Sequence, residues 1–263
     1  MFVEEIKKHL VEHIIPFWEK LKDDTYGGYY GYMGYDLKLD KQCEKGCILN
    51  SRILWLFSSA YTLLKDEKLL KDATHAYDFM KKYCVDSEYG GIYWSVTYDG
   101  KPLDTTKHTY NQAFAIYALS AYYEASKDKE ALKLAKKLFE LIEENCTDDY
   151  GYLEAFDRKF EPVENDKLSE NGVVDTTRVW WVQAETVVGF VNAWQKTKDE
   201  KYLQAAKDVW DYIKNFVIDK RNGSEWYWSV DENKNPIDKP IVEPWKCPYH
   251  NGRMCIEVIR RLG

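Results

Sequence analysis

The sequence predicts an all-α protein in which helical hairpins repeat around a ring. Three segments share apolar residues at spacings i, i+3, i+7 and i+10, which fall on one face of a helix with charged residues opposite. A more uniformly apolar segment precedes each of them, and a stretch rich in glycine and aromatic residues comes before that. Such internal repetition predicts stacked units that share one core, so we expect one domain over residues 1–263.

The three amphipathic segments, residues 66–83, 128–145 and 199–216, are predicted to be outer helices. Each would bury one stripe and expose a charged face. The stripes are Leu70, Ala73, Tyr77 and Met80; Leu132, Ala135, Phe139 and Ile142; and Leu203, Ala206, Trp210 and Ile213.

The apolar segments are predicted to be inner helices, because a helix that is apolar nearly all round must be enclosed by others. They cover residues 51–64, 109–123, 179–194 and 247–262. The last has no outer helix after it, but the first helix of the chain carries the same stripe at Val3, Ile6, Leu10 and His13. A first helix that completes the last repeat predicts a closed α/α toroid (barrel) of four helical hairpins.

Within the stretches rich in glycine and aromatic residues, apolar and polar residues alternate along the chain, as they do in short strands. We expect them to form short β-hairpins in the loops at one end of the toroid. They cover residues 27–39, 90–102, 151–162 and 224–236.

Composition excludes several classes of partner. The net charge is −7 with both signs interspersed, so neither nucleic acid nor a membrane is expected as a partner. No apolar run approaches the ~18 residues of a membrane span, and the amphipathic first helix is unlike a signal peptide, which predicts a cytoplasmic protein. The six cysteines are scattered and predict reduced thiols. No metal and no cofactor is expected.

Several segments resemble the N-acylglucosamine 2-epimerase superfamily, and within it the cellobiose 2-epimerases. They are "HIIPFWEKLKDD" (13–24), "ILNSRILWLFSSAY" (48–61), "KHTYNQAFAIYALSAYY" (107–123), "TRVWWVQAE" (177–185) and "PWKCPYHNGRMC" (244–255). The resemblance implies a contraction of the family's six-hairpin α/α barrel. The two absent hairpins would fall between residues 168–172 and 175–181.

Epimerisation next to a sugar carbonyl needs a base with a pKa near neutrality and donors for the developing oxyanion. His250 follows Pro248 in the first turn of a predicted helix, where the helix dipole disfavours imidazolium and keeps the ring neutral. The resemblance implies that His250 is one of two catalytic histidines. The alternative is a histidine that caps its own helix.

Arg52 lies early in an inner helix among apolar residues, a costly place for a fixed charge unless an anionic group meets it. The resemblance implies that Arg52 holds the substrate oxygen during enolisation. The alternative is a buried ion pair between Arg52 and Glu185.

Trp181 and Glu185 are spaced i, i+4 and face one side of their helix. The resemblance implies that Trp181 and Trp245 stack on a sugar, and that Tyr110 and Glu185 bind its oxygens. Plain core packing is the alternative for each aromatic residue.

The remaining histidines are not expected to act. His108 suits a helix cap, His13 a core position, and His9 and His75 solvated or boundary positions. The resemblance places the second catalytic histidine, a further pocket histidine and an acidic partner in the two absent hairpins.

Four inner helices packed as a square resemble a four-helix bundle whose centre is filled, so the pocket is expected to shrink or vanish. An open arc completed by a second chain is the alternative. The predicted function is that of a sugar 2-epimerase or isomerase acting on a reducing disaccharide or monosaccharide, as a monomer or homodimer. The alternatives are an inactive scaffold, natural or engineered, and a sugar-binding module without turnover.

Overall fold

The computed structural model describes residues 1–163 and 177–263. Inner helices form where the apolar segments predict them, and each observed boundary lies within four residues of the predicted one. They are α3 (Cys47–Leu64), α5 (Thr109–Ser126), α7 (Trp180–Thr197) and α9 (Tyr249–Leu262).

The predicted outer helices are also confirmed. Three of them end in, or contain, a π-helical turn, and α6 does not. They are α1 (Phe2–His9) continued by η1 (Leu10–Ile14) and α2 (Ile15–Lys20), α4 (Glu67–Phe79) with η2 (Met80–Cys84), α6 (Lys129–Asn145), and α8 (Glu200–Tyr212) with η3 (Ile213–Val217).

The same sharp turn joins the inner and outer helix of three hairpins. The inner helix ends on a lysine in the left-handed region, with φ of 59° at Lys65, 62° at Lys127 and 58° at Lys198. An aspartate follows, and its carboxylate accepts a hydrogen bond from the backbone of the outer helix's first turn. This repeated cap is why each outer helix begins where it does.

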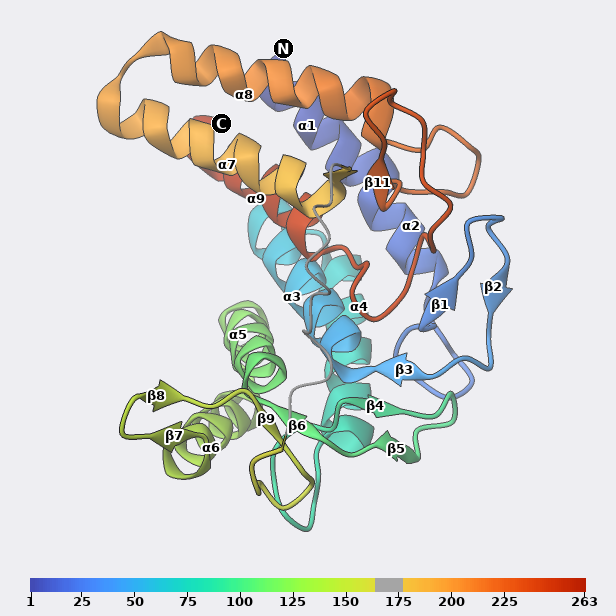
Figure 1. Cartoon of the computed structure of the whole chain (residues 1–263), viewed down its shortest axis with the longest axis vertical. Coiled ribbons are helices and arrows are strands. Elements are labelled where there is room, and N and C mark those ends of the chain that lie inside the picture. The colour runs from blue at the N-terminus through green and yellow to red at the C-terminus, as the bar shows by residue number, and fades with distance from the viewer. Residues whose placement is uncertain (164–176) are drawn as a thin grey trace.

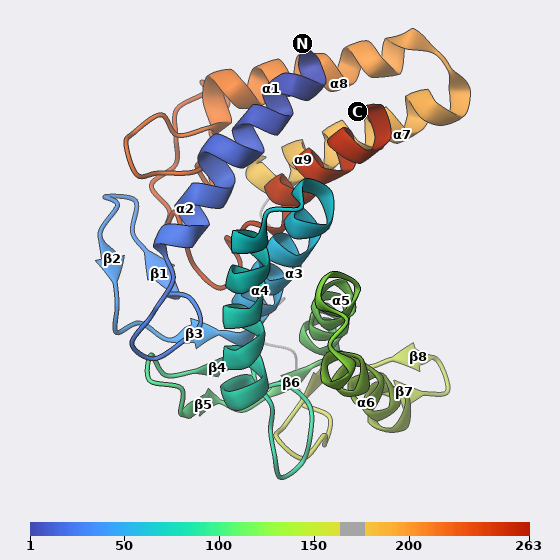
Figure 2. The same ribbon diagram turned by 180° about the vertical axis from the view of Figure 1, so that it is seen from behind.

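The hairpins form an open arc, so the predicted closed ring is wrong. In the described part of the chain, α5 packs on α3, α3 on α9 and α9 on α7, whereas α5 and α7 are not a closely packed pair. Figures 1 and 2 show α5 and α7 at the two ends of this arc. The pairing of the first and last helices is confirmed, because α1 lies alongside α9.

Short antiparallel strand pairs lie at one end of the helices. β1 pairs with β2 and β4 with β5, close to the ranges predicted, 27–39 and 90–102. The strands of the third and fourth segments pair with strands outside those segments: β8 with β7, β9 with β6 and β11 with β10. The strands are β1 (Tyr32–Met33), β2 (Leu39–Asp40), β3 (Lys45–Gly46), β4 (Ser95–Val96), β5 (Pro102–Asp104), β6 (Lys107–His108), β7 (Thr147–Asp148), β8 (Gly151–Tyr152), β9 (Ala155–Phe156), β10 (Arg178–Val179) and β11 (Ser229–Val230).

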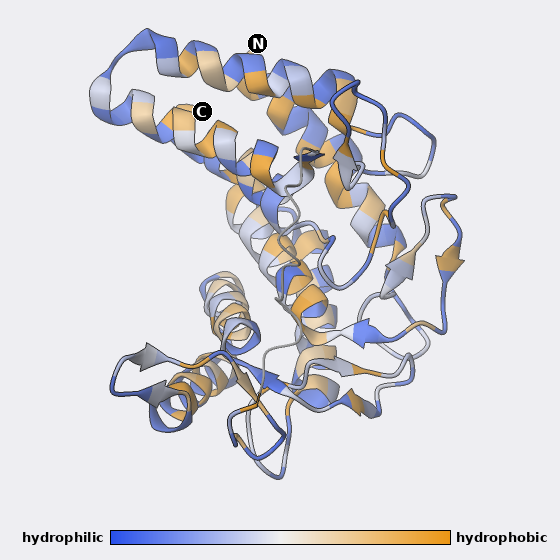
Figure 3. Cartoon of the chain, viewed as in Figure 1, coloured by the Kyte–Doolittle hydropathy of each residue, from blue (hydrophilic) through white to orange (hydrophobic). Residues whose placement is uncertain are grey.

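Burial is uneven along the arc. Helix α3, at its centre, is long and apolar enough to cross a membrane by length and composition, but most of it is buried inside the fold. Outer helix α8 shows the mixed hydrophobic and hydrophilic residues of an amphipathic helix (Figure 3). Helices α5 and α7, predicted to be enclosed, each leave one side exposed because nothing in the described chain packs there.

Buried ion pairs stand just before three of the inner helices. Lys45 bonds Asp23 at 2.6 Å, Lys107 bonds Asp86 at 3.2 Å and Lys246 bonds Glu225 at 2.7 Å. In each pair both side chains are almost fully buried, so each lysine fixes the loop before its helix to the preceding loop. These pairs set where the first turns of α3, α5 and α9 lie.

Candidate active site

A cavity of about 520 Å³ lies at the strand-bearing end of the inner helices. Residues from α3, α5, α7 and α9 meet there with side chains from the loops around β11. The lining residues are Arg52, Tyr110, Trp180, Trp181, Trp228, Glu243, Trp245 and His250. Of the six predicted site residues, Glu185 alone is not in the lining, and it contacts His250 behind the cavity wall. The expectation that the pocket would shrink or vanish is wrong as to its vanishing, because a cavity remains.

His250 is the second residue of α9, after Pro248 at the cap. Its Nδ1 lies 2.8 Å from Oε1 of Glu185. Burial lowers the pKa of His250; the bond to Glu185 opposes this shift, and the positive charge of Arg52 adds to it. His250 is therefore neutral at neutral pH, and its Nδ1 bonds Glu185 of α7 instead of capping its own helix.

Glu185 holds His250 from α7. Burial by itself would raise the pKa of Glu185, but the hydrogen bond with His250 and the charge of Arg253 hold that pKa below its usual value. Arg253 also donates a hydrogen bond to the second carboxylate oxygen. An ionised Glu185 can only accept, so Nδ1 of His250 carries the hydrogen and Nε2 carries the lone pair.

Arg52 is only 2% exposed. It donates to the hydroxyl of Tyr110 at 2.8 Å and to Sγ of Cys247 at 3.4 Å, and its guanidinium lies 4.2 Å from the ring centroid of Phe114. Among the described residues no carboxylate lies within ion-pair distance of Arg52, and its Nε makes no hydrogen bond. The predicted alternative of an Arg52–Glu185 pair is wrong, because Glu185 is bound by His250 and Arg253.

This arrangement distinguishes Arg52 from the buried lysines. Lys45, Lys107 and Lys246 each have a buried carboxylate, whereas Arg52 has a phenol and a thiol. A buried cation left without a counter-charge is costly, and that cost is relieved when an anionic group enters beside it. The cavity supplies the space for such a group.

Aromatic rings form the rest of the wall. Trp245 lies against Tyr110, with ring centroids 6.2 Å apart, and Trp180 lies 4.7 Å from Trp228. Trp181 is exposed, and its ring centroid is 5.7 Å from that of His250. Flat apolar rings of this kind suit the apolar faces of a pyranose.

Sequence analysis missed Trp180, Trp228, Glu243 and Arg253. Trp180 precedes the predicted site residue Trp181, and Glu243 precedes the segment 244–255 that resembles the family. Their positions along the chain could therefore have suggested them as site residues. Burial raises the pKa of Glu243 above its usual value, against the opposing charges of Lys239 and Lys246. Trp228 comes from a loop distant in sequence, and only the pairing of β10 with β11 brings it to α7.

The other histidines lie away from this cavity. His108 is buried against Trp94, its Nδ1 lies 3.6 Å from Glu154, and its side chain makes no cap. His75 shares a hydrogen bond of 2.9 Å with the carbonyl of Gly28. The expectations for His9 and His13 are reversed: His9 is buried and accepts a 2.8 Å hydrogen bond from Trp226, whereas His13 is exposed.

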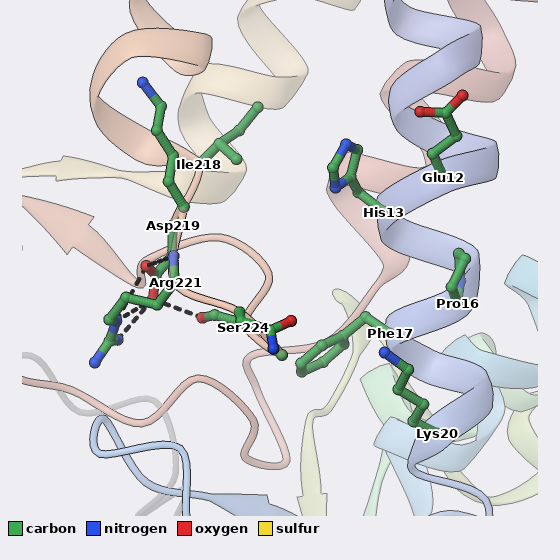
Figure 4. A pocket seen from close by; sticks show the side chains of 12 residues that line it. Glu12, His13, Pro16, Phe17, Lys20, Ile218, Asp219, Arg221 and Ser224 are labelled. Carbon is green, nitrogen blue, oxygen red and sulfur yellow. Dashed lines mark hydrogen bonds and ion pairs between the residues drawn. The ribbon is translucent and has the colours of Figure 1, made fainter.

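His13 faces a second cavity, of about 440 Å³, between the first helix and residues 218–224 (Figure 4). Two carboxylates line it: Asp219 is bound by Arg221 and Ser224, and Glu12 pairs with Lys8 at 3.8 Å. Since both carboxylates have partners and no aromatic cluster lines the cavity, the catalytic candidate remains the cavity beside His250.

Comparison with known proteins identifies the family. Residues 27–169 and 164–252 match the family N-acylglucosamine 2-epimerase (GlcNAc 2-epimerase). The chain belongs to the N-acylglucosamine 2-epimerase family. A cellobiose 2-epimerase of Ruminococcus albus is 42% identical over 99% of this chain and 99% of its own.

Solved structures of N-acylglucosamine 2-epimerase relatives carry the same arrangement. A sugar epimerase from a ruminal bacterium superposes with a TM-score of 0.98 at 41% identity, covering 100% of both chains. A cellobiose 2-epimerase from Bacillus thermoamylovorans gives 0.96 at 36% identity, covering 99% of both. The protein therefore belongs to the α/α-barrel fold class of these epimerases, and its described hairpins are arranged as an open arc.

The alignment to the Ruminococcus albus member of the N-acylglucosamine 2-epimerase family runs over 385 positions, whereas this chain has 263 residues. Part of that relative thus has no counterpart residues here. The predicted junction between residues 168–172 and 175–181 lies mostly outside the described residues.

Proposed function

We propose that this chain binds a reducing sugar in the cavity beside His250 and removes the proton next to the sugar carbonyl. The observation that carries the proposal is a neutral histidine oriented by a carboxylate, in one cavity with a buried arginine that has no carboxylate partner among the residues the structure describes. A base and an anion-stabilising cation are the two groups that enolisation requires.

The proton transfer follows from the hydrogen bonds. With Nδ1–H directed at Glu185, the lone pair of His250 Nε2 accepts the proton from the carbon beside the carbonyl. The electron pair left on that carbon forms the enediolate, and its negative charge develops on the carbonyl oxygen. Return of the proton from His250 to the same face restores the starting aldose, and delivery of a proton from water to the opposite face gives the 2-epimer.

Arg52 and Tyr110 act together on the developing oxyanion. Arginine can only donate, so the Tyr110 hydroxyl accepts from Arg52 and keeps its own hydrogen for a substrate oxygen. A donor polarised by a cation binds an oxyanion more strongly than it binds a neutral carbonyl. The stacked tryptophans would orient the sugar ring.

The test is solvent exchange at the carbon beside the anomeric centre. Cellobiose is incubated with the protein in deuterated water, and loss of that proton signal is followed by NMR. We expect exchange, and a loss of about 10²–10⁴-fold in His250→Ala. His13→Ala, which changes an exposed histidine outside the cavity, should exchange as the unchanged protein does.

Exchange that survives His250→Ala would remove the base assignment. A second candidate function is a sugar-binding module without turnover, which the aromatic lining of the cavity favours. Cellobiose would then raise the melting temperature while no deuterium enters the sugar. If cellobiose causes no melting shift and no exchange occurs, both functions are contradicted and the inactive scaffold remains.

A further inference from the structure

The cavity beside His250 holds a second side chain that can carry a proton. Glu243 lines the same cavity from the loop that precedes α9, and its side chain is partly buried. Among the residues that the structure describes, no hydrogen bond and no ion pair holds its carboxyl group. The carboxylate of Glu225, by contrast, is bound by Lys246. The carboxyl of Glu243 is therefore available to a ligand in the cavity.

The other polar side chains of the lining do not compete for this role. Arg52 keeps its protons at all ordinary pH values, and an indole can donate a hydrogen bond but does not give up its hydrogen. The Tyr110 hydroxyl is bound by Arg52 and directs its own hydrogen to a substrate oxygen. His250 and Glu243 are thus the two lining side chains that can exchange protons near neutral pH.

These two side chains occupy different parts of the cavity. The charge of Arg52 acts on the pKa of His250, whereas the largest effect of a charge on the pKa of Glu243 comes from Lys239. The ammonium of Lys239 lies over the ring of Trp228, 5.3 Å from its centroid. Glu243 therefore lies towards the Trp228 end of the cavity and His250 towards the Arg52 end. A sugar bound in the cavity would lie between them.

Epimerisation needs a proton donor on each side of the reacting carbon, because the proton leaves from one face and returns on the other. A carboxyl group with a raised pKa suits the second role, since it is present in both its protonated and its ionised form closer to neutral pH. Burial raises the pKa of Glu243 in this way, against the opposing charges of Lys239 and Lys246.

We propose that Glu243 delivers the second proton of epimerisation, to the face of the sugar opposite His250. This inference rests on the proposed function, because it needs the enediolate that His250 produces. The O–H bond of the Glu243 carboxyl breaks, and its proton bonds to carbon 2 through the electron pair of the enediolate double bond. The oxyanion at carbon 1 becomes the carbonyl again. Glu243 then regains a proton from water and His250 releases one to water, so no proton is gained or lost overall.

The same two groups exchange roles in the reverse reaction. The proton of the 2-epimer points towards Glu243, whose carboxylate removes it, and the imidazolium of His250 supplies the proton that restores cellobiose. Each of the two sugars therefore loses its proton to a different residue. A residue that only shaped the cavity would affect both sugars alike.

The experiment follows deuterium exchange at carbon 2 by NMR, starting from cellobiose and, separately, from its 2-epimer. Glutamine keeps the shape of Glu243 but carries no transferable proton. In Glu243→Gln, exchange into cellobiose should stay within about twofold of the unchanged protein, whereas exchange into the 2-epimer and conversion in both directions should fall about 10²-fold or more.

The matched control is Asp238→Asn, which changes an exposed carboxylate in the same loop. It should exchange and convert both sugars as the unchanged protein does. Cellobiose exchange that persists in Glu243→Gln shows that this variant is folded and binds the sugar.

Three results would overturn the role of Glu243 and leave the proposed function standing. One is formation of the 2-epimer by Glu243→Gln at the unchanged rate. Another is an equal loss of exchange from both sugars in that variant, which indicates a role in binding or folding. The third is an unchanged protein that exchanges cellobiose but forms no 2-epimer. An unchanged protein that exchanges neither sugar would instead remove the proposed function, and this inference with it.

Discussion

The ammonium of Lys246 lies 2.7 Å from the carboxylate of Glu225, and neither side chain reaches solvent. The same carboxylate accepts hydrogen bonds from Trp18 and from Asn251, the residue after His250. One buried anion thus ties the first helix of the chain to the first turn of α9. The position of the candidate base depends on a contact between residues that do not themselves line the cavity.

Replacing Glu225 by glutamine should cost about 3–5 kcal/mol of unfolding free energy, because Lys246 is left buried without a counter-charge. Urea unfolding monitored by circular dichroism measures this loss. Asp36→Asn, which breaks the exposed pair with Lys38, should change stability little. Equal effects from the two substitutions would contradict a special role for the buried pair.

The Glu225 pair also predicts acid sensitivity. The charge of Lys246 and its hydrogen bonds hold the pKa of Glu225 below its usual value despite burial. The stabilisation is therefore present above the unfolded pKa of about 4.3 and is lost as pH falls through the lower folded pKa. Glu225→Gln should lose this part of the pH dependence.

The bond between Glu185 and His250 predicts the pH profile of proton exchange. Because the pKa of His250 is lowered, the rate should stay level from neutral pH to below about 6.5 before it falls. Glu185→Gln removes a carboxylate that raises that pKa, so the acidic fall should move to lower pH while the maximal rate drops. Glu88→Gln, which changes an exposed carboxylate paired with Arg158 outside the cavity, should leave the profile unchanged.

Arg52→Met should reduce the exchange rate about 10²–10³-fold, because the oxyanion loses its cation and Tyr110 loses the charge that polarises it. Exchange NMR measures the rate, and circular dichroism checks that the helices remain. Arg260→Met, an exposed change on α9, is the matched control. An unaltered rate in Arg52→Met would exclude Arg52 from oxyanion stabilisation.

His9 predicts a second, independent loss of stability in acid. Burial lowers the pKa of His9 to about 4, and the nearby His13 adds to that shift. The neutral ring accepts from Trp226, so stability is present above the unfolded pKa of about 6.5 and falls by ~3 kcal/mol as pH drops towards 4. His9→Gln should flatten this decline in unfolding experiments, and exposed His13→Gln should flatten it much less.

The helices were predictable because their signals are local. The spacing of Leu203, Ala206 and Trp210 indicates the helical period of 3.6 residues. Asp199 indicates where the helix begins, because it caps the first turn. Neither signal depends on residues elsewhere in the chain. The apolar face of α6 has the same spacing and was likewise predicted to be buried, yet its Phe139 is exposed. Whether a stripe is covered depends on a neighbouring hairpin, which a local pattern does not contain.

The site was predictable in part for the same reason. His250 and Arg52 stood out by residue type and position, whereas the family resemblance implied Tyr110, Trp181 and Trp245. The fold brings all five to one cavity. The partner of each was not predictable: Glu185 meets His250 and Arg253 instead of Arg52. Partner choice depends on the relative rotation of α7 and α9, which no spacing along the chain encodes.

By itself the sequence determined the helical hairpins, their order, the pairing of the first helix with the last, and the residue types that the site contains. The tertiary structure alone decided that the hairpins stop short of a ring, that the cavity stays open, and which charges meet inside it. The physical reason is that helix formation depends on neighbours within a few residues. Closure and charge pairing depend on contacts between helices that lie far apart in the chain.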